Sequence, residues 1–218
     1  MKRKKFAALA STNASVINAV YINTLRQQFD LDLVIVDRVC GAVNFASLNQ
    51  IQLEVFDAQN PNALDQILDK HNIDYLYLFY TRLIPSEVVQ KYKGRIINFH
   101  PSLLPACPGL SGFEDTIKSG ALIAGSTAHY IDEGMDTGPQ IIQTYTSTKG
   151  VSTAELRHII FAQQCASLFQ IHKKLKMNID PLQSSDYELS EGFCPGIDAD
   201  AMLLFRKIMT LLKNKSAE

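Results

Sequence analysis

Residues 97–105 read INFHPSLLP, and in this stretch an apolar run ends in two hydrogen-bonding side chains. The isoleucines at 96–97 are typical of a buried strand, and Asn98 and His100 stand where that strand should end. A loop with proline at each end, residues 101–105, follows directly. A strand that ends in an amide and an imidazole before a stiffened loop is an unusual pattern, and it directs attention to the rest of the chain.

Apolar strands alternate with helix-like segments along the first hundred residues. Short runs rich in branched and aromatic residues predict five buried strands, at Phe6–Ala10, Leu33–Val36, Leu53–Val55, Tyr75–Phe79 and Ile96–Phe99. Helical spacing of apolar residues predicts helices at Ser15–Phe29, from Asn60-Pro61 onward, and at Pro85–Tyr92. This alternation favours an α/β fold, with a mostly parallel central sheet flanked by helices. Ligands of such sheets bind outside the carboxyl ends of the strands, where Asn98 and His100 lie.

The remaining residues predict further elements. We expect a helix at Phe113–Ser119, strands at residues 126–131 and Pro139–Thr146, a long helix from the capping box at residues 152–155 to Leu175, and a final helix around Ala201–Leu212. A seam near residues 92–95 would divide a domain at residues 1–178 into two halves, one at about 1–93 and one at about 94–178. Residues 179–218 would form a C-terminal extension.

Composition narrows the class of protein. The chain has 218 residues, 46% of them hydrophobic, which is enough for a core, and a net charge of −1 gives no reason to expect nucleic acid or an anionic membrane surface. The cysteines at 40, 107, 165 and 194 form no CxxC pair, so neither a metal site nor a disulfide framework is expected. The apolar patch Phe6–Ala10 is too short for a signal peptide. No stretch is apolar enough to span a bilayer, and we expect a cytoplasmic protein.

Three polar side chains suit chemistry at a carbonyl group. The amide of Asn98 can donate to an oxyanion, the imidazole of His100 can donate or shuttle a proton, and Asp136 can orient the imidazole or hold a proton-carrying water. No serine or cysteine stands beside them in a nucleophile motif, so direct transfer fits better than a covalent acyl-enzyme. One asparagine and one histidine at a strand end are also common without any catalytic role.

The motifs resemble a known family. INFHPSLLP, the PG at 108–109 and GSTAHYIDEGMDTGPQIIQ at 125–143 are similar to the folate-dependent formyltransferases, most closely the glycinamide ribonucleotide formyltransferases of purine biosynthesis. The resemblance implies a Rossmann-like formyltransferase fold and transfer of a formyl group from 10-formyltetrahydrofolate to an amine, with no metal. It implies that Asn98 and His100 stabilise the tetrahedral oxyanion. Asp136 would keep His100 charged and oriented and help carry the amine proton through a water.

The resemblance also implies where folate binds. The backbone at Arg82, Leu83 and Ile84 would pair with the edge of the pterin ring, and Val89 would form an apolar wall. The loop with Asp132, Glu133, Gly134 and Met135 would close the other side of the ring, and the Leu104-Pro105 bond would be cis. Without the resemblance, Leu83, Ile84 and Val89 would be taken for core residues. The partners would be folate and a small amine, with the chain a monomer or a homodimer.

The acceptor side departs from the family pattern. The family places a glycine-rich turn of the type SGNGSN after the first strand to hold the substrate phosphate, but this chain has STNASV at residues 11–16. The candidate acceptor-binding residues are Ser11, Thr12, Asn13, Ala14, Ser15 and, from the long helix, Gln164, which aligns with the acidic residue of the family that recognises the substrate amine. Alternatively, Ser11, Asn13 and Ser15 simply cap the first helix. The acceptor is therefore either glycinamide ribonucleotide or another amine, such as an amino sugar or sugar nucleotide.

Two other functions remain compatible with the motifs. A 10-formyltetrahydrofolate hydrolase would use water in place of the amine, but such enzymes carry a second histidine where this chain has Pro101. A non-catalytic, folate-binding paralogue would need none of the three polar side chains, and all three are present.

Overall fold

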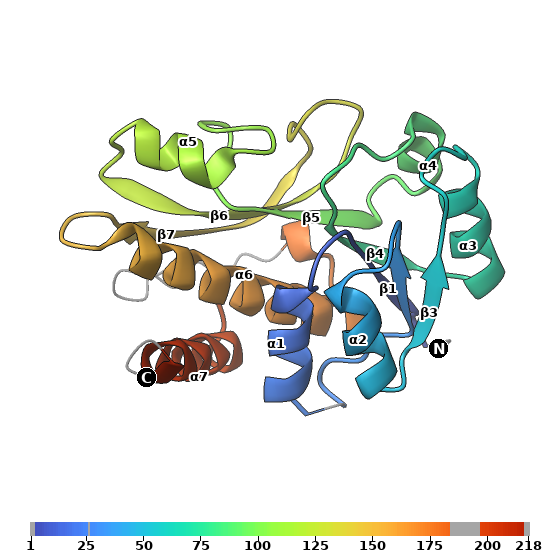
Figure 1. The fold of residues 1–218 in the computed structure, drawn as a ribbon, viewed down its shortest axis with the longest axis horizontal. Helices are drawn as coiled ribbons and strands as arrows, with labels where there is room; N and C mark the ends of the chain where they lie inside the picture. The colour runs from blue at the N-terminus through green and yellow to red at the C-terminus, as the bar shows by residue number, and fades with distance from the viewer. Residues whose placement is uncertain (1–2, 26, 184–196, 216–218) are drawn as a thin grey trace.

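One seven-stranded sheet forms the centre of the molecule in a computed structural model that describes residues 3–25, 27–183 and 197–215 (Figure 1). The strand order is β3-β2-β1-β4-β5-β6-β7. The strands are β1 Phe6–Ala10, β2 Leu33–Val36, β3 Gln52–Val55, β4 Tyr75–Phe79, β5 Ile96–His100, β6 Ile123–Tyr130 and β7 Gln140–Ser147. The first five pair in parallel, and β6 and β7 are antiparallel to their neighbours. The mostly parallel sheet predicted from the sequence is confirmed.

Helices cover both faces of this sheet. They are α1 Ser15–Asn23, α2 Gly41–Leu48, α3 Ala63–His71, α4 Ser86–Lys91, α5 Gly112–Lys118, α6 Thr153–Lys176 and α7 Ala199–Lys215. In Figure 1, α1, α2, α6 and α7 lie below the sheet, and α3, α4 and α5 lie above it. Two apolar clusters correspond to these layers: one joins the sheet to α1, α2, α6 and α7, and the other joins it to α3 and α4.

The seam expected near residues 92–95 falls between two paired strands. β4 and β5 pair directly in parallel, so the halves expected at 1–93 and 94–178 share one continuous sheet. In the expected C-terminal extension, α7 packs against α6 through Ala201, Leu204 and Ile208. None of the described helices is long and apolar enough to cross a membrane.

Two helices differ from the prediction. The first helix ends at Asn23 rather than near Phe29, because Thr24 turns to an extended backbone and its hydroxyl donates to the carbonyl of Val20. Helix α2 was not predicted, because its sequence lacks a capping signal: Cys40 precedes it without a side-chain hydrogen bond to its first turn.

The start of α3 is also corrected. The helix begins at Ala63, two residues after the predicted start at Pro61. Asn60 does not cap this helix, since its Oδ1 accepts from the backbone N–H of Asn62 and closes a turn instead.

The cysteine at 194 lies outside the described residues.

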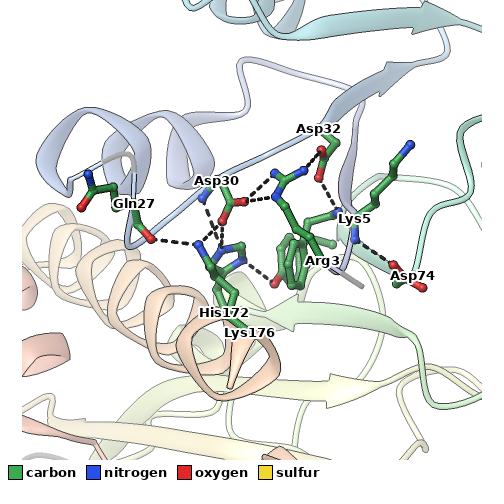
Figure 2. Close-up of polar contacts among 10 residues, drawn as sticks. Arg3, Lys5, Gln27, Asp30, Asp32, Asp74, His172 and Lys176 are labelled. Carbon is green, nitrogen blue, oxygen red and sulfur yellow. Dashed lines mark hydrogen bonds and ion pairs between the residues drawn. The ribbon is translucent and has the colours of Figure 1, made fainter. Parts of the chain in front are cut away.

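A polar network around the buried His172 connects the N-terminal segment to the long helix α6. His172 of α6 is fully buried, its Nδ1 lies 3.0 Å from the hydroxyl of Tyr77, and its Nε2 lies 3.1 Å from Oδ1 of Asp30. Asp30 also accepts from Lys176 and Arg3, each at 2.5 Å (Figure 2). Although burial raises the pKa of Asp30, the hydrogen bonds from His172, Lys176 and Arg3 hold it far below its usual range. The carboxylate therefore remains charged, and the network joins the segment before β1, the segment before β2, strand β4 and helix α6.

This network predicts a loss of stability in mild acid. Burial lowers the pKa of His172 and outweighs the hydrogen bond to Asp30, which raises it, so the unfolded chain binds a proton near pH 6.5 that the folded chain does not. The stabilisation from neutral His172 is complete above pH 6.5 and is lost as the pH falls. We expect the free energy of unfolding in urea to fall by up to about 1.4 kcal/mol per pH unit between pH 6.5 and 5.5. His172→Asn should flatten this slope, and an unchanged slope in the variant would contradict the assignment.

Candidate functional site

The three polar residues singled out in the sequence converge at the carboxyl end of β5. Nδ2 of Asn98 lies 3.4 Å from Oδ1 of Asp136, and Nδ1 of His100 lies 3.5 Å from the other carboxylate oxygen. Asn98 and His100 point to the same side of β5 because they are two positions apart along a strand, with one residue between them. Asp136 reaches them from the loop between β6 and β7. All three are thus close enough to act on a single carbonyl group.

His129 is a fourth member that the sequence reasoning missed. It lies opposite Asn98 in the antiparallel pairing of β5 with β6, and its Nε2 is 3.2 Å from Nδ2 of Asn98. Its Nδ1 lies 2.9 Å from the carbonyl oxygen of Tyr130, which can only accept, so Nδ1 carries the proton. Burial lowers the pKa of His129, and the carbonyl of Tyr130 and the charge of Asp136, which raise it, do not restore it. Neutral His129 therefore accepts from Asn98 and orients its amide.

The ring of His100 is held from the opposite side. Nε2 lies 2.7 Å from the carbonyl oxygen of Cys107, which also accepts from the hydroxyl of Ser102. Because that carbonyl can only accept, Nε2 carries a proton and Nδ1 faces Asp136. The ring is 4% exposed, and a Cβ added at Gly112 would lie 2.4 Å from Nε2. The first residue of α5 must therefore be glycine for the ring to remain in this position.

The position of Asp136 is fixed by its own backbone conformation and by a hydrogen bond from the backbone of another loop. Its φ of 56° is in the left-handed region, which few residues other than glycine and asparagine or aspartate adopt. Its Oδ2 accepts from the backbone N–H of Gly109 at 2.7 Å, which ties the loop between β6 and β7 to the PG of residues 108–109. The Leu104-Pro105 bond is cis, as the resemblance implied. These constraints hold the carboxylate against Asn98 and His100.

The turn that follows β1 contains a residue with left-handed backbone dihedral angles that is not glycine. Ala14 has φ 49° and ψ 36°, and its side chain is buried in the core rather than directed at the cleft. Among the described residues no side-chain hydrogen bond caps α1, so the alternative in which Ser11, Asn13 and Ser15 cap this helix is not supported. Instead Oγ of Ser11 accepts from the backbone N–H of Thr81, and Asn13 packs against Gly41.

Gln164 of α6 lies beside β5. Its Nε2 donates to the carbonyl oxygen of Phe99 at 2.9 Å, between Asn98 and His100 in the chain. Gln164 is therefore next to the proposed reaction centre, and the same hydrogen bond holds its amide in place.

The predicted folate residues fall into two groups. Val89, Asp132, Glu133 and Gly134 line a cavity of about 870 Å³ beside the loop between β6 and β7. The other four lie outside its lining: Arg82 is paired with Asp37 at 3.6 Å, Leu83 and Met135 are exposed, and Ile84 packs at the margin of the apolar cluster below α3 and α4. Glu133 accepts from Nε2 of Gln90 at 2.7 Å, which joins the loop to α4.

The hydrogen bond from Asn98 to His129 predicts a measurable role for the missed histidine. His129→Gln removes an aromatic acceptor that is held in one tautomer, so the amide of Asn98 should lose its fixed orientation. We expect the rate of the reaction at this site to fall by about tenfold, which corresponds to the free energy of about one hydrogen bond. His158→Gln, in the first half of α6, is the matched control, and equal rates in the two variants would contradict the positioning role of His129.

Among the described residues, no group of three or more side chains could hold a metal ion, and Cys40, Cys107 and Cys165 are free thiols. The amide of Asn98 and the imidazoles of His100 and His129 offer hydrogen bonds, and the carboxylate of Asp136 offers an acceptor for a proton.

Comparisons with known proteins agree with the fold and the motifs. A family model described as formyl transferase matches residues 4–156. A phosphoribosylglycinamide formyltransferase of Bacillus subtilis is 36% identical over 151 residues, which cover 64% of this chain and 77% of that protein. The chloroplastic enzyme of the same name from Arabidopsis thaliana is 32% identical over 160 residues, 66% of this chain and 55% of that protein. The crystal structure of the Bacillus halodurans phosphoribosylglycinamide formyltransferase superposes with a TM-score of 0.73 at 32% identity, covering 79% of this chain and 95% of that one.

Proposed function

The chain belongs to the formyl transferase family, and from that membership we propose that it transfers the formyl group of 10-formyltetrahydrofolate to the amine of glycinamide ribonucleotide. The observation that carries this proposal is the convergence of Asn98, His100 and Asp136 within 3.5 Å contacts at the carboxyl end of β5. The names of the relatives support this acceptor. The catalytic unit we propose is 1–178, of which the family model matches residues 4–156.

The first chemical step is attack of the acceptor amine on the formyl carbon. The carbonyl oxygen becomes an oxyanion, and two N–H groups converge on the place where it forms. Asn98 keeps one N–H on His129, whereas its second N–H faces Asp136 at 3.4 Å, a long hydrogen bond that turns readily toward a stronger acceptor. A proton on Nδ1 of His100, which faces the same carboxylate, supplies the second donor.

Asp136 serves the proton transfers. Its Oδ2 lies 3.5 Å from Nδ1 of His100 and can accept a hydrogen bond from a proton held there. The attacking amine must lose a proton after it bonds to carbon, and a water on Asp136 carries that proton away from the new nitrogen–carbon bond. The intermediate then collapses, the bond from carbon to the nitrogen of the folate breaks, and that nitrogen takes up a proton as tetrahydrofolate leaves.

The cosubstrate fits between α4 and the loop that carries Asp136. Val89 is 7% exposed and offers the apolar wall proposed for the pterin ring, and Leu83 and Met135 are exposed on the surface. Backbone groups at Arg82 and Ile84 would then pair with the ring edge. The Gln90–Glu133 hydrogen bond spans the two sides and would have to open or shift as the ring enters.

The acceptor phosphate fits at the start of α1. Among the described residues no side chain caps the N–H groups of the first turn, and the left-handed Ala14 keeps the backbone path that a glycine adopts readily. Thr12 is exposed where the family has the first glycine of its turn, and its side chain narrows the approach. These features support a phosphate-bearing acceptor, with a cradle that is tighter than the one the glycines allow.

A panel of amines tests this proposal. We expect glycinamide ribonucleotide to release tetrahydrofolate at least tenfold faster than amino sugars or sugar nucleotides, because only the ribonucleotide places a phosphate at the first turn of α1 while its amine reaches Asn98. The readout is formylated product together with tetrahydrofolate. If an amino sugar were formylated faster, the proposed acceptor would be wrong. If formate were released without any amine, the chain would be a hydrolase rather than a transferase.

A further inference from the structure

A buried hydroxyl group on β6 holds the loop that follows β5. Thr127 of β6 stands opposite His100 in the antiparallel pairing of the two strands, and it is fully buried. Its Oγ1 donates to the carbonyl oxygen of Ser102 at 2.8 Å and accepts from the backbone N–H of Leu104 at 3.0 Å. A single hydroxyl therefore closes this part of the loop onto the sheet.

A glutamine on the next strand completes this anchor. Gln143 of β7 stands opposite Thr127, and its Nε2 donates to Oγ1 of Thr127 at 3.1 Å and to the carbonyl oxygen of Leu104 at 2.7 Å. A hydroxyl has one donor and two acceptor sites, and the hydrogen bonds of Thr127 to Ser102, Leu104 and Gln143 use all of them. The backbone at Leu104 is therefore fixed relative to both β6 and β7.

From this anchor a chain of hydrogen bonds leads to the imidazole of His100. The hydroxyl of Ser102, which is also fully buried, donates to the carbonyl oxygen of Cys107 at 2.8 Å. The same carbonyl lies 2.7 Å from Nε2 of His100 and accepts the proton on that nitrogen. The position of the ring thus depends on Thr127 through the loop, by way of Ser102 and Cys107.

We propose that Thr127 is a positioning residue for His100, which fixes through Ser102 and Cys107 the orientation of the ring and the nitrogen that carries its proton. With the loop in place, Nε2 holds its proton against the carbonyl of Cys107, and Nδ1 faces Asp136 at 3.5 Å. If the loop shifts, Nε2 loses that acceptor, and neither the orientation of the ring nor the place of its proton stays fixed. The effect on the rate rests on the proposed function, whereas the place of the proton is a property of the free protein.

This role gives β6 a support for each of the two polar residues at the end of β5. His129 stands opposite Asn98 and accepts from its amide, and Thr127 stands opposite His100. Residues two positions apart on a strand point to the same face of a sheet, so both supports lie on the face that carries the site. His129 acts on its partner directly, whereas Thr127 acts on its partner through the loop.

The test is the nitrogen NMR spectrum of the ring of His100 in the free protein over a range of pH, with the signal assigned by its loss in His100→Gln. We expect the neutral ring of the unmodified chain to carry its proton on Nε2. Thr127→Val replaces the hydroxyl by a methyl group, and about a tenth or more of the neutral ring should then carry its proton on Nδ1. Thr127→Ser keeps the hydroxyl and should restore the single form.

The matched control is Thr144→Val on β7. Thr144 is fully buried as well, and its Oγ1 lies 2.9 Å from Oγ of Ser126. Because Ser126 precedes Thr127 directly along β6, this hydroxyl pair lies on the opposite face of the sheet. Thr144→Val should therefore remove a comparable buried hydrogen bond and leave the single form of the ring of His100 unchanged.

A second variant tests the chain of hydrogen bonds from its other end. Ser102→Ala removes the hydroxyl that donates to Cys107 and keeps Thr127, so it should give the same mixture of ring forms, and it decides the question if Thr127→Val does not fold. In both variants kcat for formyl transfer should fall by about tenfold while KM stays within about twofold.

Two results would overturn the positioning role: a single form of the ring of His100 in Ser102→Ala or in folded Thr127→Val, or the same mixture in Thr144→Val. The spectra need neither substrate. A mixture of ring forms in the two variants of a chain that transfers no formyl group would therefore support the positioning role and contradict the proposed function instead.

Discussion

Asn98→Ala is expected to lower the rate of formyl transfer by about 10²–10³, with a much smaller effect on the binding of either substrate. The reason is geometric: the amide lies at the end of β5, contacts Asp136 and is oriented by a buried acceptor, His129. Its N–H would stabilise a charge that exists only in the transition state, so its removal affects kcat rather than KM. The measurement is initial-rate release of tetrahydrofolate over a range of both substrates.

The control for this variant removes an equivalent amide elsewhere. Asn49→Ala deletes a side chain that also donates to a backbone carbonyl, that of Phe45, at the end of α2 and away from the cleft. Its rate should match that of the unmodified chain. If Asn98→Ala kept more than about a tenth of the rate, or lost only substrate affinity, the oxyanion role of Asn98 would be wrong.

Regular periodicity made most of the fold predictable. The strands at residues 6–10, 33–36 and 75–79 were predicted to the residue, since buried strands of a parallel sheet are continuous apolar runs with polar flanks. Helix α2 was missed because tertiary packing rather than a local signal stabilises it: Ala42, Phe45 and Ala46 are buried, but no polar face or cap marks the segment in the sequence. The first helix was predicted too long for the opposite reason. Its apolar periodicity continues in the sequence beyond Thr24, where the helix ends in the structure.

The site was predictable only in part. Asn98, His100 and Asp136 could be found because their motif is local and distinctive. His129 lies in the same motif, yet its role depends on the pairing of β6 with β5, in which it stands opposite Asn98. That partnership requires an antiparallel register, which the alternating strand pattern at 126–131 does not specify. The hydrogen bond from His100 to the carbonyl of Cys107 could not be predicted for a similar reason. Every residue has a backbone carbonyl, so the residue type does not indicate which one accepts.

Gly112→Ala is the second substitution for which we expect a large effect. It distinguishes an effect on the position of His100 from an effect on the stability of α5. Alanine favours a helix by up to about 1 kcal/mol over glycine, so helix propensity alone predicts a more stable α5. The added Cβ would instead lie 2.4 Å from Nε2 of His100 and 3.1 Å from the carbonyl oxygen of Cys107. The ring is buried and held on both nitrogens, so α5 or the ring must move, at a cost of about 1–3 kcal/mol in unfolding free energy.

The expected result of Gly112→Ala is therefore a folded protein whose rate of transfer is reduced by about 10²-fold or more, because a shift near 1 Å at a reacting group has effects of this size. Gly120→Ala, just beyond the same helix, is the matched control. Gly120 has a φ of 67° and no atom within 4 Å of an added Cβ, so alanine there strains the backbone without touching the site. It should lower stability by about 1 kcal/mol and leave the rate unchanged. Parallel losses of rate in both variants would show that α5 acts through stability alone, whereas a loss confined to Gly112→Ala would place His100 at the reacting carbonyl.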